Sequence, residues 1–484
     1  AYTVLVFPLF WMAVSVIAAF TQGFIVAPNE LDKEKQFIQY NIEKTRESYN
    51  LNNVIERDFE VRTDLSQSVV AANRDTVDNI RVTDYNATLR SNNQLQAIRR
   101  YFKFQDIDVI NYKVNGRDNA VFISARELDK DSLDEKIYIN MLYRYTHGYG
   151  IVMNPANSFT PDGQVEYITK DIPTFSIDSN LKVTEPRIYY GELTNDYVIV
   201  NGRNIKEIDY EQNAETVYQG KGGIKLNHMN RLLFSLKYGD FRMLVSNYID
   251  ANSRILLNRN VVKRVKRAAP FLNIDQDPYI ILTRDGRLKW IVDAYTTSSN
   301  FPYAELYGEI NYIRNSVKAV VDAYDGTVDL YIIDKKDPMI LTYQKMYPGV
   351  FVEAEIPADV KEHMRYPELL FHIQTEMLKR YHMADAQTFY NNEDLWAIAK
   401  HQAGQEKGEV KDIEPFYNMI RLPEPEGKGV EFILMRPYTP DKKDNMVSWL
   451  AVKNAYENYG QLILYKFGKS TVVYGPMQIT TAIN

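Results

Sequence analysis

The first 27 residues form a predominantly apolar stretch, AYTVLVFPLFWMAVSVIAAFTQGFIVA, and no charged residue occurs before Glu30. About 20 apolar residues are needed to cross the ~30 Å hydrocarbon core of a membrane, so this stretch is long enough. A cleavable signal peptide is the alternative, but it would need a basic start and a shorter apolar run. We therefore predict a transmembrane helix over residues 1–27. Because the chain begins with Ala1, we expect this helix to be the last of several in a longer protein.

Beyond this stretch, several segments show the spacing of amphipathic helices. Between Leu31 and Leu51, the apolar residues Phe37, Ile38 and Ile42 are separated by charged residues, which predicts a helix lying on the core. The same kind of pattern predicts helices within residues 92–102, 228–272, 357–383 and 392–402, and a helix followed by a strand within 446–467.

Strand signals lie between these helices. Asn115-Gly116, Asp285-Gly286 and Asp325-Gly326 each lie between runs rich in β-branched and aromatic residues, and such dipeptides favour the tight turns of β-hairpins. The pattern predicts an α+β fold with mixed antiparallel sheets and packed helices after the transmembrane helix. We place a first exterior α+β domain at residues 28–227 and a second at 228–484, which contains the two Asp-Gly hairpins and the C-terminal helices.

Composition narrows the function classes. The net charge of −6 argues against nucleic acid as a partner, because phosphate binding relies on a basic surface. The chain contains no cysteine, which excludes disulfides, thiolate metal sites and thiol catalysis within it. Tyrosine is abundant, with 36 copies against 4 tryptophans, which favours sheets and protein–protein contact surfaces.

Signatures of common enzyme classes are absent from the sequence. GKS at 468–470 lacks the earlier glycine of a P-loop, and GYG at 148–150 has Met153 where the dinucleotide fingerprint needs its third glycine. There is no G-x-S-x-G elbow and no H-E-x-x-H motif. Nucleotide-binding, serine-hydrolase and zinc-protease functions therefore have no support from sequence motifs.

His147 is the strongest single candidate for catalysis. It lies in YRYTHGYG beside Tyr145 and Tyr149, on a predicted loop where glycines let the backbone approach a ligand. A cluster of histidine and tyrosines can perform general acid–base catalysis. A structural histidine held by hydrogen bonds is the alternative.

Five aspartates are candidate ligands. Asp106 and Asp108 have the spacing that places two side chains on one face of a strand. Asp275 and Asp277 resemble the start of a calcium loop, although Tyr279 and Ile280 take the places of its third ligand and glycine. These pairs and Asp322, at the Asp325-Gly326 turn, could hold a divalent cation such as Ca²⁺; solvated or turn positions are the alternative. No other cofactor is predicted.

A basic run, RILLNRNVVKRVKR, begins at Arg254. Such a run can contact anionic lipid or a cell-wall polymer. The alternative is a helix whose basic face pairs with the acidic remainder of the protein.

Long phrases of the chain resemble a known family. RAAPFLNIDQDPYI, WIVDAYTTSSNFPYA, NYIRNSVKAVVDAYDG and RYPELLFHIQTEMLKRYHM are similar to uncharacterised protein family 0182, a group of large prokaryotic integral membrane proteins. The resemblance covers nearly the whole chain from about Pro28. It implies a multi-pass membrane region upstream and a large domain outside the membrane, and it supplies no activity, cofactor or catalytic residue.

The sequence thus predicts an integral protein of the cell membrane, in contact with lipid, whose large domain lies on the exterior face. The preferred function is a structural or assembly role in the cell envelope, with an exterior domain that forms homo-oligomers. Two alternatives stay open: an envelope module that binds a polymer, lipid or cation, and an envelope hydrolase that uses His147 and nearby carboxylates. Whether the protein is an enzyme is left open, with a non-enzymatic role preferred.

Overall fold

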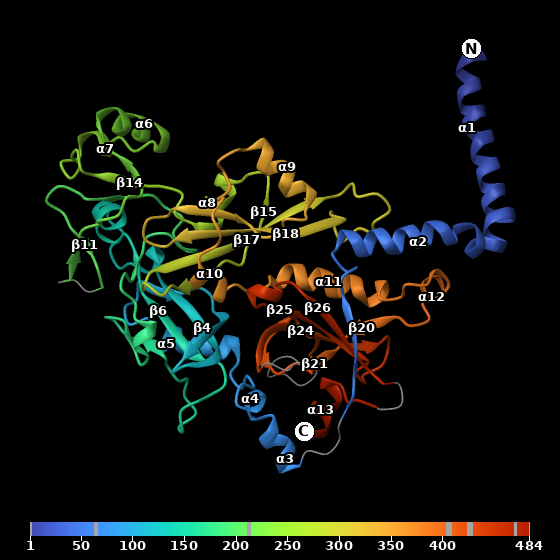
Figure 1. Cartoon of the computed structure of the whole chain (residues 1–484). Coiled ribbons are helices and arrows are strands. Elements are labelled where there is room, and N and C mark those ends of the chain that lie inside the picture. Colours follow the sequence, from blue (N-terminus) through green and yellow to red (C-terminus); the bar gives the residue numbers. More distant parts are fainter. Residues whose placement is uncertain are drawn as a thin grey trace.

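An apolar N-terminal helix precedes a mixed α/β body built mainly from antiparallel sheets (Figure 1). The computed structural model describes residues 2–61, 66–210, 214–402, 409–423, 429–468 and 472–483. The N-terminal region contains α1 (Tyr2–Phe20), a π-helical turn (Thr21–Val26), a 3₁₀ turn (Ala27–Asn29) and α2 (Glu30–Ser48). The predicted mixed α and β architecture with an apolar N-terminal helix is confirmed.

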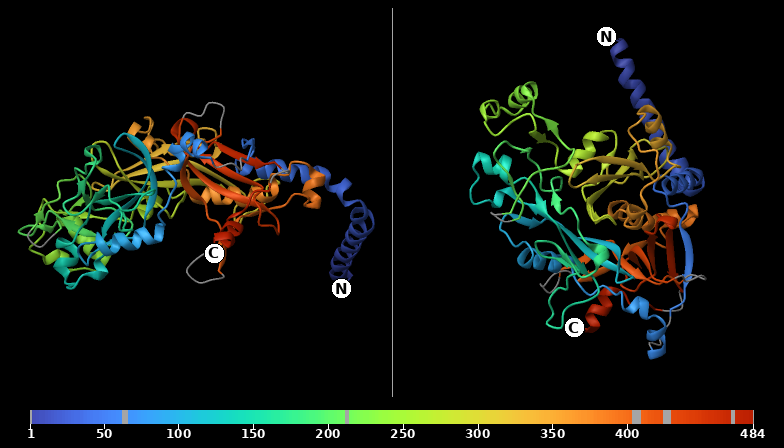
Figure 2. Two further views of the ribbon diagram at one scale, coloured as in Figure 1. Left: turned by 90° about the horizontal axis from the view of Figure 1, so that it is seen from below. Right: turned by 60° about the vertical axis from the view of Figure 1, so that its left-hand side comes forward.

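The side chains of α1 are exposed from Val6 on, where the structure describes them. The helical stretch Val6–Ser48 contains an 18-residue window with a mean hydropathy of 1.9, long and apolar enough to cross a membrane, and none of this window is buried. Both views of Figure 2 show α1, in dark blue, projecting away from the body.

The helix α2 attaches this projection to the body, as its amphipathic pattern predicted. Ile42 is buried on its inner face, and Asn41 donates a hydrogen bond to the carbonyl of Tyr303. Arg46 donates to the carbonyl of Tyr381, at the end of α11 (Glu368–Tyr381). α2 also contacts α12 (Ala386–Asn391).

The first large sheet contains the Asn115-Gly116 hairpin. Its strand order is β2-β4-β6-β7-β8, with β3 paired to β4. The strands are β2 (Phe102–Phe104), β3 (Asp108–Val114), β4 (Arg117–Leu128), β6 (Ile151–Pro155), β7 (Thr169–Lys170) and β8 (Phe175–Ser176). The hairpin prediction is confirmed, with φ of 50° at Asn115 and 77° at Gly116.

The helix predicted over residues 92–102 is wrong in position. It is α5 (Tyr85–Leu95), which begins after Asp84, whose side chain accepts a hydrogen bond from the amide of Ala87. Ile98 has a φ of 63°, which a right-handed helix cannot accommodate, so the helix ends before it.

The second sheet contains both Asp-Gly hairpins and confirms them. Its order is β15-β17-β18-β19, with β16 paired to β17. The strands are β15 (Asn273–Ile274), β16 (Tyr279–Leu282), β17 (Leu288–Ser298), β18 (Tyr312–Asp322) and β19 (Val328–Ile332). Trp290 and Val320 belong to a hydrophobic core that also contains Ile123 of the first sheet.

The third sheet combines one strand from the start of the body, β1, with strands from its C-terminal part. β1 pairs parallel with β26, and the other pairings in this sheet are antiparallel. The strands are β1 (Ile55–Phe59), β20 (Trp396–Ile398), β23 (Phe416–Ile420), β24 (Glu431–Pro440), β25 (Ser448–Lys453) and β26 (Leu462–Phe467).

Two helix predictions in the C-terminal part of the chain are wrong. Residues 392–402 contain β20 and β21 (Lys400–Gln402), and the first part of 446–467 is β25. Every residue of β25 is buried, and a strand buried on both faces gives a continuous apolar run that periodicity does not distinguish from a helix.

Smaller elements cover the sheets. The segment predicted to be helical over 228–272 contains three helices, α6, α7 and α8, interrupted by β14. The further strands are β5 (Gly148–Tyr149), β9 (Arg187–Ile188), β10 (Val198–Val200), β11 (Glu207–Ile208), β12 (Glu215–Thr216), β13 (Ile224–Lys225), β14 (Arg254–Leu256) and β22 (Val410–Asp412). The further α-helices are α3 (Gln67–Ala72), α4 (Arg74–Val77), α6 (His228–Tyr238), α7 (Arg242–Val245), α8 (Val261–Ala268), α9 (Pro338–Met346), α10 (Ala358–Glu362) and α13 (Pro476–Ile483).

The domain boundary between residues 227 and 228 stays a prediction. Packing crosses it at several places: for example, one hydrophobic core contains Ile123 and Val320, and β1 pairs with β26.

Gly326 is expected to be far less tolerant of substitution than Gly116, although both lie in hairpin turns at positive φ. A Cβ at Gly326 would collide with the ring of Tyr190, whereas a Cβ at Gly116 would meet nothing within 4 Å. We expect Gly116→Ala to cost about 1–2 kcal/mol for the left-handed backbone. Gly326→Ala should cost about 1–3 kcal/mol more because of overpacking. Denaturant unfolding of both variants measures the difference, and equal losses would contradict the role of Tyr190.

Candidate functional site

Three carboxylates from two distant parts of the sequence converge at one place. Asp106 precedes β3, Asp108 is its first residue, and Asp277 lies between β15 and β16. One ligand oxygen of each lies within 4.8 Å of the others. The structure therefore brings together one member of the predicted Asp275–Asp277 pair and both members of the Asp106–Asp108 pair. We call Asp106, Asp108 and Asp277 the carboxylate cluster.

Arg365, between α10 and α11, is the cation of this cluster. Its Nη2 lies 2.7 Å from Asp108 Oδ1 and 3.1 Å from Asp277 Oδ2. Its guanidinium also lies over the rings of Tyr279 and Tyr417, 4.4 Å and 5.2 Å from their centroids. Arg365 and Asp108 are both buried, and a buried charge is tolerated only when it is paired.

A second buried ion pair lies next to Arg365. Lys318 Nζ of β18 is 2.6 Å from Asp293 Oδ1 of β17, and it donates a 2.6 Å hydrogen bond to the carbonyl of Arg365. The hydroxyl of Tyr459 donates to the same carbonyl. The carboxylate cluster is thus continuous with a polar network that links the first sheet, the second sheet and the segment before β26.

Burial makes the carboxyl groups of this region weaker acids. Burial raises the pKa of Asp106, and the charge of Asp277 raises it further. Burial likewise raises the pKa of Glu368, the first residue of α11, to about 7; Arg365 opposes this shift, and Asp277 and Asp106 add to it. Burial, with the charge of Asp293, raises the pKa of Asp275 to about 6. Negative charge is therefore crowded around a single guanidinium.

Asp275 and Asp322 have other partners. The hydroxyl of Tyr295 donates to Asp275, which also accepts a hydrogen bond from the amide of Asp277. Asp322 lies at the end of β18, where it pairs with Arg287 at 2.9 Å and accepts hydrogen bonds from the amides of Tyr324 and Asp325. Asp322 is thus a turn residue with its own counterion, and it is not part of the carboxylate cluster.

The carboxylate cluster is a candidate site for the divalent cation that the sequence predicts, but Arg365 competes with a cation for these carboxylates. Ca²⁺ binds oxygen ligands, and three carboxylates at this separation are suitable donors. However, the guanidinium of Arg365 already pairs with two of them. Cation binding at the carboxylate cluster stays a prediction.

His147 is buried, and both of its ring nitrogens have partners. Nδ1 lies 2.8 Å from Thr146 Oγ1, and Nε2 lies 3.2 Å from Asp209 Oδ1. Asp209 also accepts two hydrogen bonds from Arg187. Burial opposes the charged form, but hydrogen bonds with Asp209 and Glu207 raise the pKa of His147 overall.

Tyr145 and Tyr149, which the sequence places beside His147, pack against other tyrosines. The ring of Tyr145 packs edge-on against Tyr101, and that of Tyr149 packs against Tyr210, with centroid distances of 5.0 Å and 5.3 Å. His147 itself contacts the ring of Tyr189 at 4.7 Å. Neither cavity described next is lined by these residues. The hydrogen bonds agree with the structural alternative, and a catalytic role for His147 stays a prediction.

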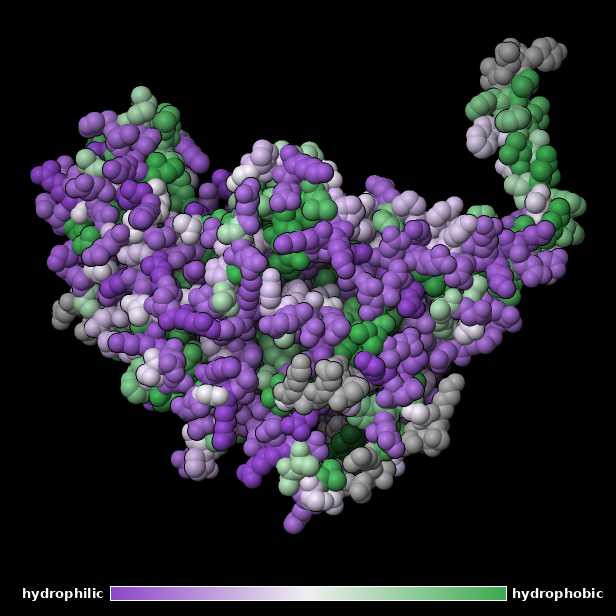
Figure 3. Space-filling view, in the orientation of Figure 1, coloured by the Kyte–Doolittle hydropathy of each residue, from purple (hydrophilic) through white to green (hydrophobic). Residues whose placement is uncertain are grey.

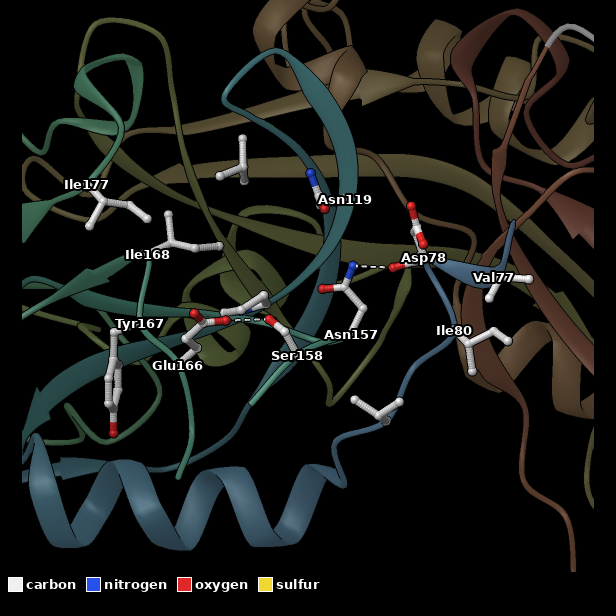
Figure 4. Close-up of a pocket in the computed structure, with 13 residues that line it drawn as sticks. Val77, Asp78, Ile80, Asn119, Asn157, Ser158, Glu166, Tyr167, Ile168 and Ile177 are labelled. Carbon is white, nitrogen blue, oxygen red and sulfur yellow. Dashed lines mark hydrogen bonds between the residues drawn. The ribbon is translucent and has the colours of Figure 1, made fainter. Parts of the chain in front are cut away.

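A cavity of about 560 Å³ lies between the segment after α4 and the first sheet (Figure 4). Apolar side chains such as Val77, Ile80 and Ile177 line it. On its wall, Asn157 donates to the carbonyl of Asp78, and Ser158 donates to the carboxylate of Glu166 (Figure 4).

A second cavity, of about 1010 Å³, is bordered by β3, the β16–β17 turn and α10. In its wall, His363 stacks on Tyr112 at 4.0 Å and its Nδ1 lies 2.9 Å from the carbonyl oxygen of Asn111. Burial lowers the pKa of His363. Arg284 and Glu362 on the rim form an ion pair. Sequence reasoning missed both cavities because their residues come from segments far apart in the chain and share no motif.

Part of the basic run from Arg254 is used inside the protein. Arg254 donates to the carbonyls of Lys221, Gly222 and Gly223, and buried Arg259 donates to that of Tyr189. The exposed members are Lys263, Lys266 and Arg267 of α8. Lipid or polymer contact by this helix stays a prediction.

Comparison with known proteins gives one consistent result. The model of the uncharacterised protein family UPF0182 matches residues 1–484. A UPF0182 protein of Caldicellulosiruptor saccharolyticus is 47% identical over 476 residues, covering 97% of this chain and 52% of that protein. A UPF0182 protein of Desulfitobacterium hafniense is 44% identical over 476 residues, covering 96% of this chain and 49% of that protein. The chain thus spans about half the length of these relatives. No solved structure matches.

Replacing Arg365 by methionine tests its role as the cation of the cluster. Arg365→Met leaves the buried carboxylate of Asp108 uncompensated and should lower the free energy of unfolding by about 3–5 kcal/mol near neutral pH. The control Arg284→Met removes an exposed ion pair and should cost about 0–1 kcal/mol.

The loss in Arg365→Met should depend on pH. Arg365 opposes the rise in the pKa of Glu368, which is about 7 in the wild type, so removing Arg365 raises this pKa further. Since a carboxyl group with a raised pKa in the folded state loses stability as pH rises through that pKa, the loss relative to wild type should grow as pH rises past about 7. Denaturant unfolding at pH 5 and pH 8 measures this, and a loss that is equal at both pH values would contradict the charge argument.

Calcium titration tests the cation prediction separately. We expect Ca²⁺ to raise the melting temperature of the wild-type chain, because a ligand that binds only the folded state stabilises it. The double variant Asp106→Asn/Asp277→Asn should lose this increase, whereas Asp118→Asn, a half-buried aspartate of β4 outside the carboxylate cluster, should keep it. An unchanged melting temperature in the wild type at millimolar Ca²⁺ would exclude a cation site of useful affinity.

Proposed function

The chain belongs to the uncharacterised protein family UPF0182, and on this premise we propose that it is a cell-envelope protein that α1 anchors in the cell membrane, with a non-catalytic body on the exterior face. The observation that carries this proposal is the apolar helix α1, whose described side chains, from Val6 on, are exposed to solvent. Exposed Phe7, Phe10 and Trp11 would be costly in water and are favourable in lipid.

The connection between α1 and the body supports an anchor rather than a loose tail. α2 follows the span directly and packs on the body through buried Ile42 and through hydrogen bonds to Tyr303 and Tyr381. At its start, the carboxylate of Glu30 accepts a hydrogen bond from Tyr390. The body is thus attached to α2, which begins immediately beyond the end of the apolar segment.

The charges that follow the span favour the exterior face. Glu30, Asp32, Lys33, Glu34 and Lys35 are of mixed sign, whereas cytoplasmic flanks are enriched in Lys and Arg. This weak asymmetry is the basis on which the body is proposed to lie outside the cell.

A structural role is preferred over hydrolysis because His147, the proposed catalytic residue, is buried and lies outside both described cavities. His147 is buried, with Thr146 and Asp209 at its two ring nitrogens. General acid–base catalysis requires contact with a substrate, and this histidine lines neither described cavity. Self-association of the body stays a prediction; several tyrosines that suggested it, including Tyr189, Tyr295 and Tyr438, are buried.

Single-cysteine labelling tests the anchor and its orientation together, since these 484 residues contain no cysteine. In intact cells, a membrane-impermeant maleimide should label Tyr456→Cys, on the body, and should not label Trp11→Cys, whose thiol would lie in lipid and stay protonated. The cysteine-free protein is the control for background. Labelling of Tyr456→Cys only after permeabilisation would contradict the exterior placement, and labelling of Trp11→Cys in intact cells would contradict the membrane span.

A further inference from the structure

The outer face of α6 carries an apolar stripe that faces solvent. Met229, Leu232, Leu233 and Leu236 have the i, i+3, i+4, i+7 spacing with which a helix normally packs on a core, yet they are 62%, 42%, 54% and 59% exposed. The short helix α7 continues this surface with Phe241, Leu244 and Val245. We call these seven residues the α6–α7 tip. Contiguous exposed apolar surface of this kind marks an interaction site.

The tip is a well-packed element, so its exposed stripe is not caused by a poorly folded helix. Asn227 caps the start of α6 by accepting a hydrogen bond from the amide of Asn230. Arg231 donates to the carbonyls of Met243, Leu244 and Ser246, which joins α6 to α7. Met243 is buried in a small core with Tyr143 and Ile255.

The charges around the tip are basic. Asp240 is the sole acidic residue between positions 228 and 245, and it is buried and paired with Arg242. Lys237 is exposed on α6, and Lys221 and Lys225 are exposed just before it. An apolar face with exposed lysines on the same helix and on the segment that leads into it suits the interface of a membrane with anionic lipids. There the apolar side chains enter the acyl boundary and the ammonium groups remain among phosphates.

The position of the tip agrees with this chemistry. In Figure 1 and in the right view of Figure 2, α1 and the α6–α7 tip project from the same side of the body, whereas α13 lies on the opposite side. Figure 3 shows hydrophobic side chains gathered over α6 and α7 and along α1. A bilayer that contains α1 would therefore extend over the side of the body that carries the tip.

From this arrangement we propose that the α6–α7 tip is a second membrane contact, lying in the interface of the bilayer that α1 spans. The inference rests on the proposed anchoring by α1. Two contacts at opposite ends of one side fix the tilt of the body relative to the membrane, which a single helix does not.

Depth-dependent quenching tests this contact in the full chain. Leu233→Cys and Val245→Cys, each labelled with an environment-sensitive fluorophore, are reconstituted in vesicles of phosphatidylcholine and phosphatidylglycerol. Ile17→Cys in α1 reports anchoring, and Ile479→Cys, an exposed residue of α13 on the opposite side, is the matched control. Because an interfacial helix lies roughly 5–10 Å deep, a nitroxide near the lipid headgroup should quench both tip labels more than one near the chain end. The label at Ile479→Cys should keep its fluorescence with both lipids.

The outcomes separate this inference from the anchoring on which it rests. Quenching at Ile17→Cys without quenching at the tip would leave the anchor intact and overturn the second contact. No quenching at either place would overturn the anchoring itself. Tip labels that shift to the blue without lipid quenching would show that protein, such as a second copy of the chain, covers the tip, and this too would overturn the proposal. A further variant, Leu233→Glu/Leu236→Glu, should abolish quenching at Val245→Cys while leaving that at Ile17→Cys unchanged.

Discussion

The packing of the body depends on one buried charge. Arg365 lies where the first, second and third sheets meet, and it contacts each of them. It forms an ion pair with Asp108 of the first sheet and cation–π contacts with Tyr279 of the second and Tyr417 of the third. Its backbone carbonyl also accepts a hydrogen bond from Lys318 of the second sheet. Transfer of a guanidinium from water into this position costs several kcal/mol unless its partners are held in place. The three sheets must therefore pack together, because the buried charges in one sheet need partners from the others.

In this interior, tyrosine hydroxyls donate hydrogen bonds to buried backbone carbonyls. The hydroxyls of Tyr112, Tyr417 and Tyr438 donate to the backbone carbonyls of Leu282, Tyr366 and Thr375, each in a different part of the chain. A tyrosine fills apolar space with its ring and satisfies a distant carbonyl with its hydroxyl, which a phenylalanine cannot do. These tyrosines thus connect segments that are far apart within one chain.

The sequence predicted what is encoded locally and missed what depends on tertiary contacts. The three hairpins follow from Asn-Gly and Asp-Gly dipeptides, and the apolar N-terminal helix and the amphipathic α2 follow from their own periodicity. The strands β20 and β25 were mistaken for helices because their partners, not their own pattern, decide their conformation. Likewise, the aspartate spacing indicated two candidate pairs, but the sequence held no signal that Arg365 would be placed between them.

The pairing of β1 with β26 has a consequence for how the protein is made. β1 follows the anchor closely, yet its partner strand comes so late that Glu56 and Lys466, which bond across this pair, are 410 positions apart. Until nearly all of the remaining chain has been synthesised, β1 therefore has an unpaired edge, and such an edge is prone to aggregation. The fold thus carries a risk during synthesis that ends only when β26 pairs with β1.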